Sequence, residues 1–392
     1  MGFRITTNMM KSNYLYNLNS VNTKTNKARE KVMTQRNFNR YAEDPAAATQ
    51  AFRLRRSYWQ TSTHLANTTD TYQRFNAAWS SLGTLVTDLS DKTARASAVL
   101  GITGTAGEGR NALGQVMEET AKSMVHTMNM KYGDQFVFAG ADALDVPLSW
   151  DEATGNLLYR GVNVAAGGVK EPTSTAPAWG TLDANGIPEN LPESTDQLTD
   201  DELEWYNYYK DRSDLVKLEA MAKETQYVDL GMGMQEAASA TLQNGQVING
   251  SAFDASLPAI SVLGYGVDDE GDPKNIILLT KQLGEIFSRA TASGFDSPED
   301  EATANRLLNK LNASHEELTR QYTDMDTKAQ FLQTAEGRLT DQQAALNEQI
   351  LSVEQIDMAD AITEFSWQQY CYNAALKIGN QLLSESLIDY MR

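Results

Sequence analysis

The sequence predicts a mainly α fold with an α+β insertion. Both chain ends form a long antiparallel coiled-coil-like helical bundle, and a β-rich outer domain is inserted in the middle. Three observations predict it. Apolar residues recur at alternating spacings of three and four over both chain ends, which is typical of helices packed lengthwise. Seven of the nine prolines lie between residues 141 and 275. That stretch also holds seven basic against 24 acidic residues, so its surface differs from that of the ends.

The longest apolar repeat lies in residues 308–392. Every seventh residue from Leu311 to Val353 is apolar, and no proline interrupts the stretch. The rhythm slips by one residue and resumes from Met358 to Leu383. A repeat of 3.5 residues holds one face of a helix against a partner helix. We therefore predict a helix that, at ~1.5 Å per residue, spans roughly 120 Å and needs a partner of similar length.

The partner helices are predicted over residues 12–34, 45–100 and 110–130. Asp44 and Pro45 open the second of them, because aspartate caps helix N-termini and proline fits the first helical turn. The glycine-rich run 101–109 lacks the Lys-Ser/Thr pair of a phosphate-binding loop, so we interpret it as a reversal of the chain. The residues that we expect to form the assembly seam of the two chain ends share the heptad spacing. They are Leu18, Val21, Leu65, Tyr72, Phe75, Trp79, Leu82, Leu318, Met325, Leu332, Leu339, Leu346, Ile362, Phe365, Leu376 and Leu383.

Short strands and loops are predicted between the helical ends. Residues 147–161 are typical of a β-hairpin around a Thr-Gly-Asn turn, and 165–198 are a long loop. A helix is predicted over 198–226, opened by a capping box between Thr199 and Glu202. The other expected elements are strands at 135–138, 227–233, 245–248 and 260–265, and a helix over 274–292 with a seam through Ile276, Leu279, Leu283, Ile286 and Ala290.

Two features of the middle could indicate ligands. The aromatic residues Trp205, Tyr206, Tyr208 and Tyr209 could stack on nucleic-acid bases, but acidic neighbours favour packing against adjacent strands. The acidic run 268–273 lacks the alternating ligands and distal glutamate of a calcium-binding loop, so we interpret it as a turn and expect no metal there.

These patterns divide the chain into three parts. Residues 1–42 and 350–392 are expected to form a terminal helical assembly domain. Residues 43–140 and 226–349 are expected to form a helical bundle domain with return strands. Residues 141–225 are the inserted outer domain, β-rich with one helix.

Charge and composition limit the classes of partner. The net charge is −19, whereas residues 1–60 alone hold eleven basic against three acidic residues. We interpret the basic start as solvated helix faces and inter-subunit pairing, and expect neither nucleic acid nor a membrane as partner. No apolar run is long enough for a bilayer, and no signal peptide is expected at the start. Cys371 is the only cysteine, which excludes an internal disulfide.

Catalytic signatures are scarce. The chain has three histidines, and His315, on the predicted seam, is expected to be a hydrogen-bonded core residue rather than a ligand. The Gly-x-Ser-x-Gly elbow of common hydrolases does not occur. We therefore expect no enzyme, no catalytic residues, no cofactor and no metal.

Five stretches carry a family resemblance: residues 4–10 (RITTNMM), 40–48 (RYAEDPAAA), 133–140 (GDQFVFAG), 357–364 (DMADAITE) and 383–391 (LSESLIDYM). In them the chain resembles the bacterial flagellar hook–filament junction proteins, also called hook-associated protein 3, of the flagellin superfamily. The Phe-Ala-Gly motif and the Ser-Leu-Ile-Asp-Tyr-Met ending are similar to the junction proteins rather than to filament flagellin.

The resemblance implies a secreted structural adaptor at the hook–filament junction, needed for motility. The implied partners are hook-associated protein 1 on the hook side, flagellin on the filament side, copies of the chain in a ring, and a dedicated export chaperone at the C-terminal region. It further implies export through the flagellar channel, and residues 1–40 and 355–392 that fold on assembly.

Two alternatives remain open at this stage. One is filament flagellin itself, a structural protein of the same superfamily. The other is a secreted binding or catalytic module carried by the middle domain.

Overall fold

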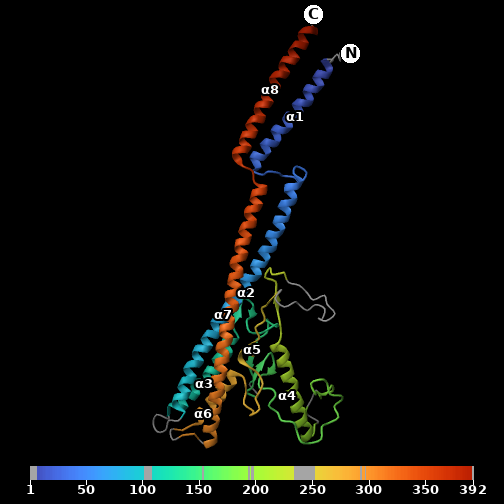
Figure 1. The fold of residues 1–392 in the computed structure, drawn as a ribbon. Helices are drawn as coiled ribbons and strands as arrows, with labels where there is room; N and C mark the ends of the chain where they lie inside the picture. The colour runs from blue at the N-terminus through green and yellow to red at the C-terminus, as the bar shows by residue number, and fades with distance from the viewer. Residues whose placement is uncertain are drawn as a thin grey trace. The chain divides into compact units, whose positions relative to one another are not determined.

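The computed structural model describes residues 7–100, 108–151, 154–192, 195, 198–233, 252–291, 294–295 and 297–390, with side chains for all of these except 7, 8, 108 and 382–390. Most of this part is helical, as Figure 1 shows. The helices are α1 (Thr7–Thr34), α2 (Pro45–Val99), α3 (Glu108–Met128), α4 (Asp200–Ala222), α5 (Ala259–Leu263), α6 (Ile276–Arg289), α7 (Pro298–Glu354) and α8 (Met358–Tyr390).

The strands of the described residues form three small antiparallel sheets. Their orders are β1-β2, β3-β4-β5 and β6-β7. The predicted hairpin is confirmed: β3 pairs with β4 through Leu148 and Tyr159, and Gly155 turns the chain at a φ of 69°. The strands are β1 (Lys131–Tyr132), β2 (Gln135–Phe136), β3 (Leu148–Trp150), β4 (Leu157–Tyr159), β5 (Val162–Asn163), β6 (Tyr227–Val228) and β7 (Phe253–Asp254).

The predicted fold class is confirmed. The chain is mainly helical, the helices of its two ends pack together, and a small sheet-containing insertion lies between them. By its contacts the chain divides into two compact units, which we call unit 1 (residues 1–63 and 338–392) and unit 2 (residues 64–337). The finer division into three domains stays a prediction.

Several predicted local signals are confirmed at atomic detail. Asp44 accepts a hydrogen bond from the Ala47 N–H at 2.9 Å, which caps α2 as expected. The Thr199 and Glu202 side chains form a reciprocal capping box at the start of α4. Such caps satisfy amide groups that have no partner inside the helix.

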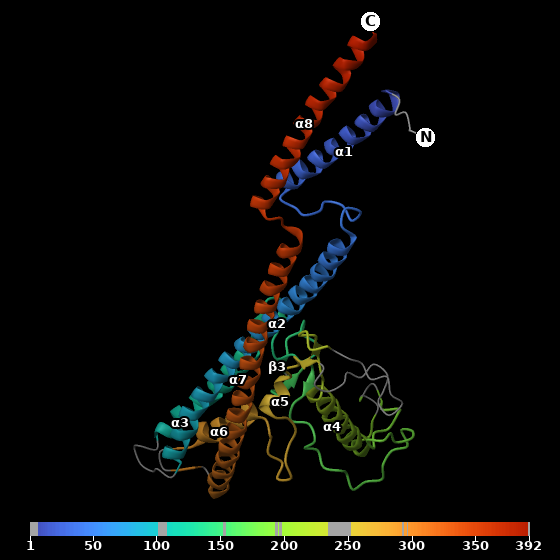
Figure 2. The same cartoon turned by 45° about the horizontal axis from the view of Figure 1, so that its top comes forward.

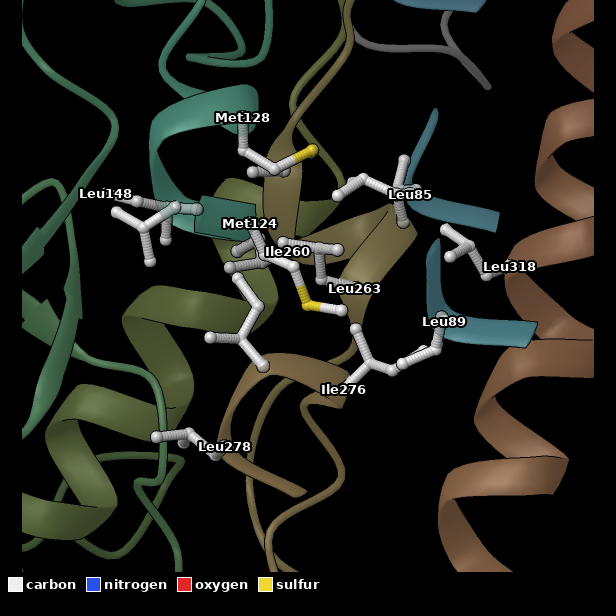
Figure 3. Close-up of a cluster of buried hydrophobic side chains, with 14 of the residues drawn as sticks. Leu85, Leu89, Met124, Met128, Leu148, Ile260, Leu263, Ile276, Leu278 and Leu318 are labelled. Carbon is white, nitrogen blue, oxygen red and sulfur yellow. The ribbon is translucent and has the colours of Figure 1, made fainter. Parts of the chain in front are cut away.

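Unit 2 is built around one apolar core. The part of α2 in this unit contributes Phe75 and Leu82, the part of α7 contributes Leu332, and all three side chains are 0% exposed. Figure 3 shows Met124 of α3 beside Ile260 and Leu263 of α5. Helices cover this core from several sides. The heptad residues of unit 2 are therefore packed against other side chains of the same chain.

One predicted strand is wrong. Residues 260–265 were expected to be extended, but α5 runs from Ala259 to Leu263. Four of its five side chains are buried, and a short apolar run reads the same in a buried strand and a buried helix. The strands expected at 135–138 and 227–233 shrink to two residues each, and the one expected at 245–248 lies outside the described residues.

The long C-terminal helix is also interrupted, which corrects the prediction of one helix over 308–392. It breaks between Glu354 and Met358, where the apolar rhythm slips. Asp357 caps α8 by accepting the Ala359 N–H at 2.8 Å. The Glu354 carbonyl accepts the Asn37 N–H at 2.8 Å, so the two connecting segments of unit 1 bond to each other.

The α3 and α6 helices approach each other through glycines. A Cβ added to Gly114 would lie 2.6 Å from the Gly284 carbonyl oxygen, and one on Gly284 would lie 2.9 Å from the Gly114 carbonyl oxygen. Beside them, the Ser288 hydroxyl donates to Glu118 at 2.6 Å. Backbones this close leave no room for a methyl group.

We predict that Gly114→Ala destabilises unit 2 by about 1–3 kcal/mol, because an overpacked contact between two backbones cannot relax through a side chain. Gly337→Ala in α7 is the matched control, since a Cβ there meets nothing within 4 Å. It should stabilise by about 0.5–1 kcal/mol, the ordinary gain of alanine over glycine in a helix. Urea unfolding of both variants measures the difference, and equal effects would contradict the close approach.

Candidate assembly surface

The helices of the two chain ends pair antiparallel in unit 1. Figures 1 and 2 both show α1 alongside α8, with the two termini at the same end. The predicted α1 seam faces α8: Leu18 and Val21 are half-buried and Ala28 is buried. The Thr25 hydroxyl donates to the Gln368 carbonyl at 3.3 Å.

On α8 the register differs from the prediction at alternate positions. Phe365 is half-buried as expected, but Ile362 and Leu376 are 49% and 43% exposed. The inward positions belong to residues one step earlier, Ala361 and Ala375 among them. Small side chains there let α1 come close, which the apolar spacing alone could not indicate. The side chain of Leu383 lies outside the described set.

Tyr14 and Gly379 fix the distance between the two helices. The Tyr14 hydroxyl donates to the Ala375 carbonyl of α8 at 3.1 Å. Its ring lies against Gly379, so close that a Cβ on Gly379 would overlap the ring and hydroxyl atoms. Gly379 therefore provides the space that the Tyr14 ring occupies, which we call the Tyr14 socket, and does not only lower the stability of the helix.

The other predicted seam residues lie within the helical packing of their own units. In unit 2, Leu65, Tyr72 and Trp79 of α2 are half-buried, and the Trp79 ring stacks on Tyr322 with centroids 5.4 Å apart. In unit 1, Leu346 is half-buried. The remaining predicted residues are buried, namely Phe75, Leu82, Leu318, Met325 and Leu332 in unit 2 and Leu339 in unit 1. A role of any of them in assembly stays a prediction.

Exposed apolar side chains concentrate on unit 1. Among the described residues, 14 of the 22 exposed large hydrophobic side chains belong to it, although it holds less than a third of the chain. On α8, Trp367 and Tyr370 are 61% and 67% exposed and stack on each other at 5.9 Å. The other twelve are Met9, Met10, Leu15, Tyr16, Met33, Tyr41, Phe52, Trp59, Leu351, Ile362, Leu376 and Ile378. This concentration of exposed apolar side chains makes unit 1 the candidate interaction surface.

The heptad analysis missed the exposed aromatic residues of α8 because they lie off its seam. A signal was present: Ile362, Trp367, Tyr370 and Ile378 place apolar side chains around more than one face of that helix. A helix that is apolar on several faces is normally covered on several sides.

The two units differ in net charge. Unit 1 contains 14 basic and 11 acidic residues, whereas unit 2 contains 19 basic and 41 acidic residues. Copies of unit 2 therefore repel one another, while the weak net charge of unit 1 opposes association little. The exposed apolar side chains lie mostly on the unit where repulsion is weakest.

The acidic turn of unit 2 is confirmed as a turn, and it binds cationic side chains of the chain itself. The Lys310 ammonium lies 2.5 Å from Asp268 and 2.6 Å from both Glu270 and Asp272. Arg306 adds a hydrogen bond to Asp272 at 2.7 Å. Although the three carboxylates are close enough to share a metal ion, Lys310 already occupies the point where they converge.

The same contacts shift the protonation of the turn. The hydrogen bond from Lys310 lowers the pKa of Asp268. Burial alone would raise the pKa of Asp272, but hydrogen bonds from Arg306 and Lys310 outweigh it and lower that pKa. Lys310 is partly buried, which lowers its pKa, and its three carboxylate partners raise the pKa overall.

Two other predictions about the middle can be placed. The His315 ring nitrogen Nε2 lies 3.1 Å from the Val86 carbonyl, so this histidine is hydrogen-bonded as expected. Trp205, Tyr208 and Tyr209 of α4 contact one another, and two of them also contact the long loop. The helix itself packs against strand β5. Trp205 donates to the Ser174 carbonyl at 3.2 Å, and Tyr209 meets Trp179.

None of the described helices is long and apolar enough to span a bilayer. No family model and no curated protein matches the sequence. Among solved structures, the chain is similar to one from Vibrio parahaemolyticus described as a flagellar hook-associated protein. The identity is 12%, the match covers 79% of this chain and 99% of the other, and the TM-score is 0.49. It is also similar to Bacillus cereus FlgL at 11% identity, covering 76% and 99%, with a TM-score of 0.42.

We predict that Gly379→Ala separates α1 from α8, because the added methyl group collides with the Tyr14 ring. The cost should be about 1–3 kcal/mol, seen as faster hydrogen exchange in residues 7–34. The double variant with Tyr14→Ala removes the collision and should recover part of the protection. If Gly379→Ala exchanges like the parent chain, the socket assignment is wrong.

A second prediction concerns acid. Because the pKa values of Asp268 and Asp272 are lowered by folding, their contribution to stability is complete above about pH 4, the ordinary value for aspartate, and is lost as the pH falls through the lowered values. The free energy of unfolding in urea should therefore drop between pH 5 and pH 2.5, and drop less in the variant Asp268→Asn/Asp272→Asn.

Asp324→Asn is the control for this acid effect, since Asp324 forms an exposed pair with Lys328 at 2.9 Å. Exposed pairs contribute little to stability. Identical acid profiles for the double variant and this control would contradict the role of the turn.

Proposed function

We propose that the chain is a non-catalytic structural adaptor of the bacterial flagellum, located outside the cell at the junction of hook and filament. It joins a hook-associated protein to flagellin by self- and hetero-assembly through its terminal helices. The observation that carries this proposal is the set of exposed apolar side chains on α1 and α8. A soluble chain keeps such a surface only where a partner covers it.

The sequence motifs support the flagellar setting. One of the five stretches that resemble the junction proteins, residues 133–140, lies in unit 2. The other four lie at the start of α1, at the corner that leads into α2, and along α8. These elements belong to unit 1, which carries most of the exposed apolar side chains. Motif and surface thus coincide on the same helices.

The partners follow as parts of the same proposal. Hook-associated protein 1 lies on one side of a ring of copies and flagellin on the other, and an export chaperone covers the C-terminal region before assembly. Head-to-tail contacts between different patches of identical chains generate such rings and open assemblies. The acidic unit 2 then faces water, where its repulsion keeps neighbouring copies from packing at random.

Immunogold labelling and deletion test the location. Antibody to unit 2 should mark one band between hook and filament, and cells lacking the chain should release flagellin into the medium. Label along the whole filament would show a flagellin subunit instead, and loss of neither filament nor motility would overturn the adaptor role.

We predict that Trp367→Ser/Tyr370→Ser weakens assembly without unfolding the monomer, because both side chains are exposed in the free chain. Aromatic hot spots at interfaces contribute about 2 kcal/mol or more each, so the assembling concentration should rise by at least about 30-fold, the factor for one such side chain. Phe331→Ser is the control, an exposed aromatic residue of unit 2. Light scattering of the purified chains measures both, and equal losses would reject the α8 surface.

A further inference from the structure

A second candidate site lies in unit 2, which does not include α1 or α8. A cavity of about 470 Å³ opens between α4 and the long loop that precedes it. Pockets of this size are typical of small-molecule sites. The cavity brings together chemistry from two segments separated in sequence, because Gly167 and Asn185 of the loop line it together with Tyr208 and Arg212 of the helix.

The lining of the cavity is of mixed character. Its apolar part includes the Tyr208 ring with Leu215 and Val216 of α4. The polar lining includes the side chains of Asp211 and Arg212. Such a lining offers a flat hydrophobic surface together with groups that both donate and accept hydrogen bonds.

Hydrogen bonds inside the protein hold these groups in place. The Asp211 carboxylate accepts the N–H groups of Gly167 at 2.8 Å and Val169 at 3.0 Å through one oxygen. Arg212 donates to the Asn185 carbonyl at 2.6 Å and to the Tyr208 hydroxyl at 3.0 Å. Groups fixed in this way lose little conformational entropy when a ligand arrives.

Each of these groups keeps capacity for a ligand. The Tyr208 hydroxyl accepts from Arg212, so its own proton is available for donation. Asp211 retains its Oδ1 atom, to which no described residue donates. Beneath the cavity, Tyr208 contacts the rings of Trp205 at 5.7 Å and Tyr209 at 5.4 Å, which fixes the plane of its ring.

We propose that this cavity binds a neutral saccharide. A sugar ring has a C–H face that packs on an aromatic ring and an edge of hydroxyl groups that donate and accept hydrogen bonds. The cavity lining offers both an aromatic ring and hydrogen-bonding groups for these two features. The charged lining residues are Asp211, Glu219 and Arg212, a net charge of −1, which disfavours phosphorylated, sulfated and sialylated ligands.

The test uses the full-length chain on an array of neutral mono- to tetrasaccharides of glucose, galactose, mannose and their N-acetylated amines, with sialylated and sulfated glycans beside them. At least one neutral glycan should bind, and its affinity is then measured by calorimetry. Tyr208→Ala should weaken this binding at least 10-fold, because it removes the stacking surface. Val216→Trp places a larger side chain in the cavity while leaving Tyr208 in place, and should also weaken binding at least 10-fold.

Tyr206→Ala is the matched control, since Tyr206 lies on the same helix but does not line the cavity. It should bind like the parent chain. Circular dichroism confirms that each variant is folded. The proposal is overturned if no neutral glycan binds, if anionic glycans bind as tightly, or if binding survives both cavity variants. Assembly through α8 should be unchanged by all of these substitutions, so the two proposals fail independently.

Discussion

Two paired helices can bury only the stripe that each turns toward the other. This geometric limit governs unit 1, where α1 and α8 have mainly each other as partners. Ala28 and Ala361 are buried between them, while Trp367 and Tyr370 remain in water. In unit 2 the same kind of helix is surrounded, so Leu332 of α7 is 0% exposed. Similar heptads thus give a closed core in one unit and an open apolar face in the other. The open face is the physical reason to infer a partner.

The charge of unit 2 limits how readily copies of the chain associate through that open face. The 41 acidic residues of unit 2 give each copy a strong negative charge, and like-charged molecules approach each other slowly. Association then depends on matching the apolar surfaces of unit 1 rather than on general stickiness. Some of the acidic charge of unit 2 is compensated within the chain. Lys310 of α7 forms ion pairs with three carboxylates of one turn. The turn is held by ion pairs formed within the chain.

Local signals in the sequence predicted local structure well. Asp44 capped α2 and Thr199 capped α4 because a capping side chain reaches only its own helix. The failures depended on distant partners. Residues 259–263 form a helix that was predicted as a strand. Nearly every side chain there is apolar and buried, so the sequence lacks the periodicity that distinguishes a helix from a strand. The spacing did not indicate that Ile362 is exposed in the single chain, because small residues, not large ones, line the contact of α8 with α1. The cavity beside α4 could not be predicted at all, since it depends on how a loop without periodicity folds back.

Two glycines show that the effect of a residue on stability depends on the side chains packed against it. Gly337 and Gly379 both lie inside long helices, and helix propensity assigns both the same penalty. Around Gly337 nothing lies where a side chain would be, so the penalty is its whole effect. Gly379 holds the Tyr14 ring, so the flexibility it adds to α8 is offset by a contact that alanine would forbid. A helix at the end of a chain, with only one neighbour to stabilise it, needs such a contact more than a helix inside a core does. The Tyr14–Gly379 contact therefore holds α1 and α8 together. By doing so it also determines which apolar side chains of the pair stay exposed to partners.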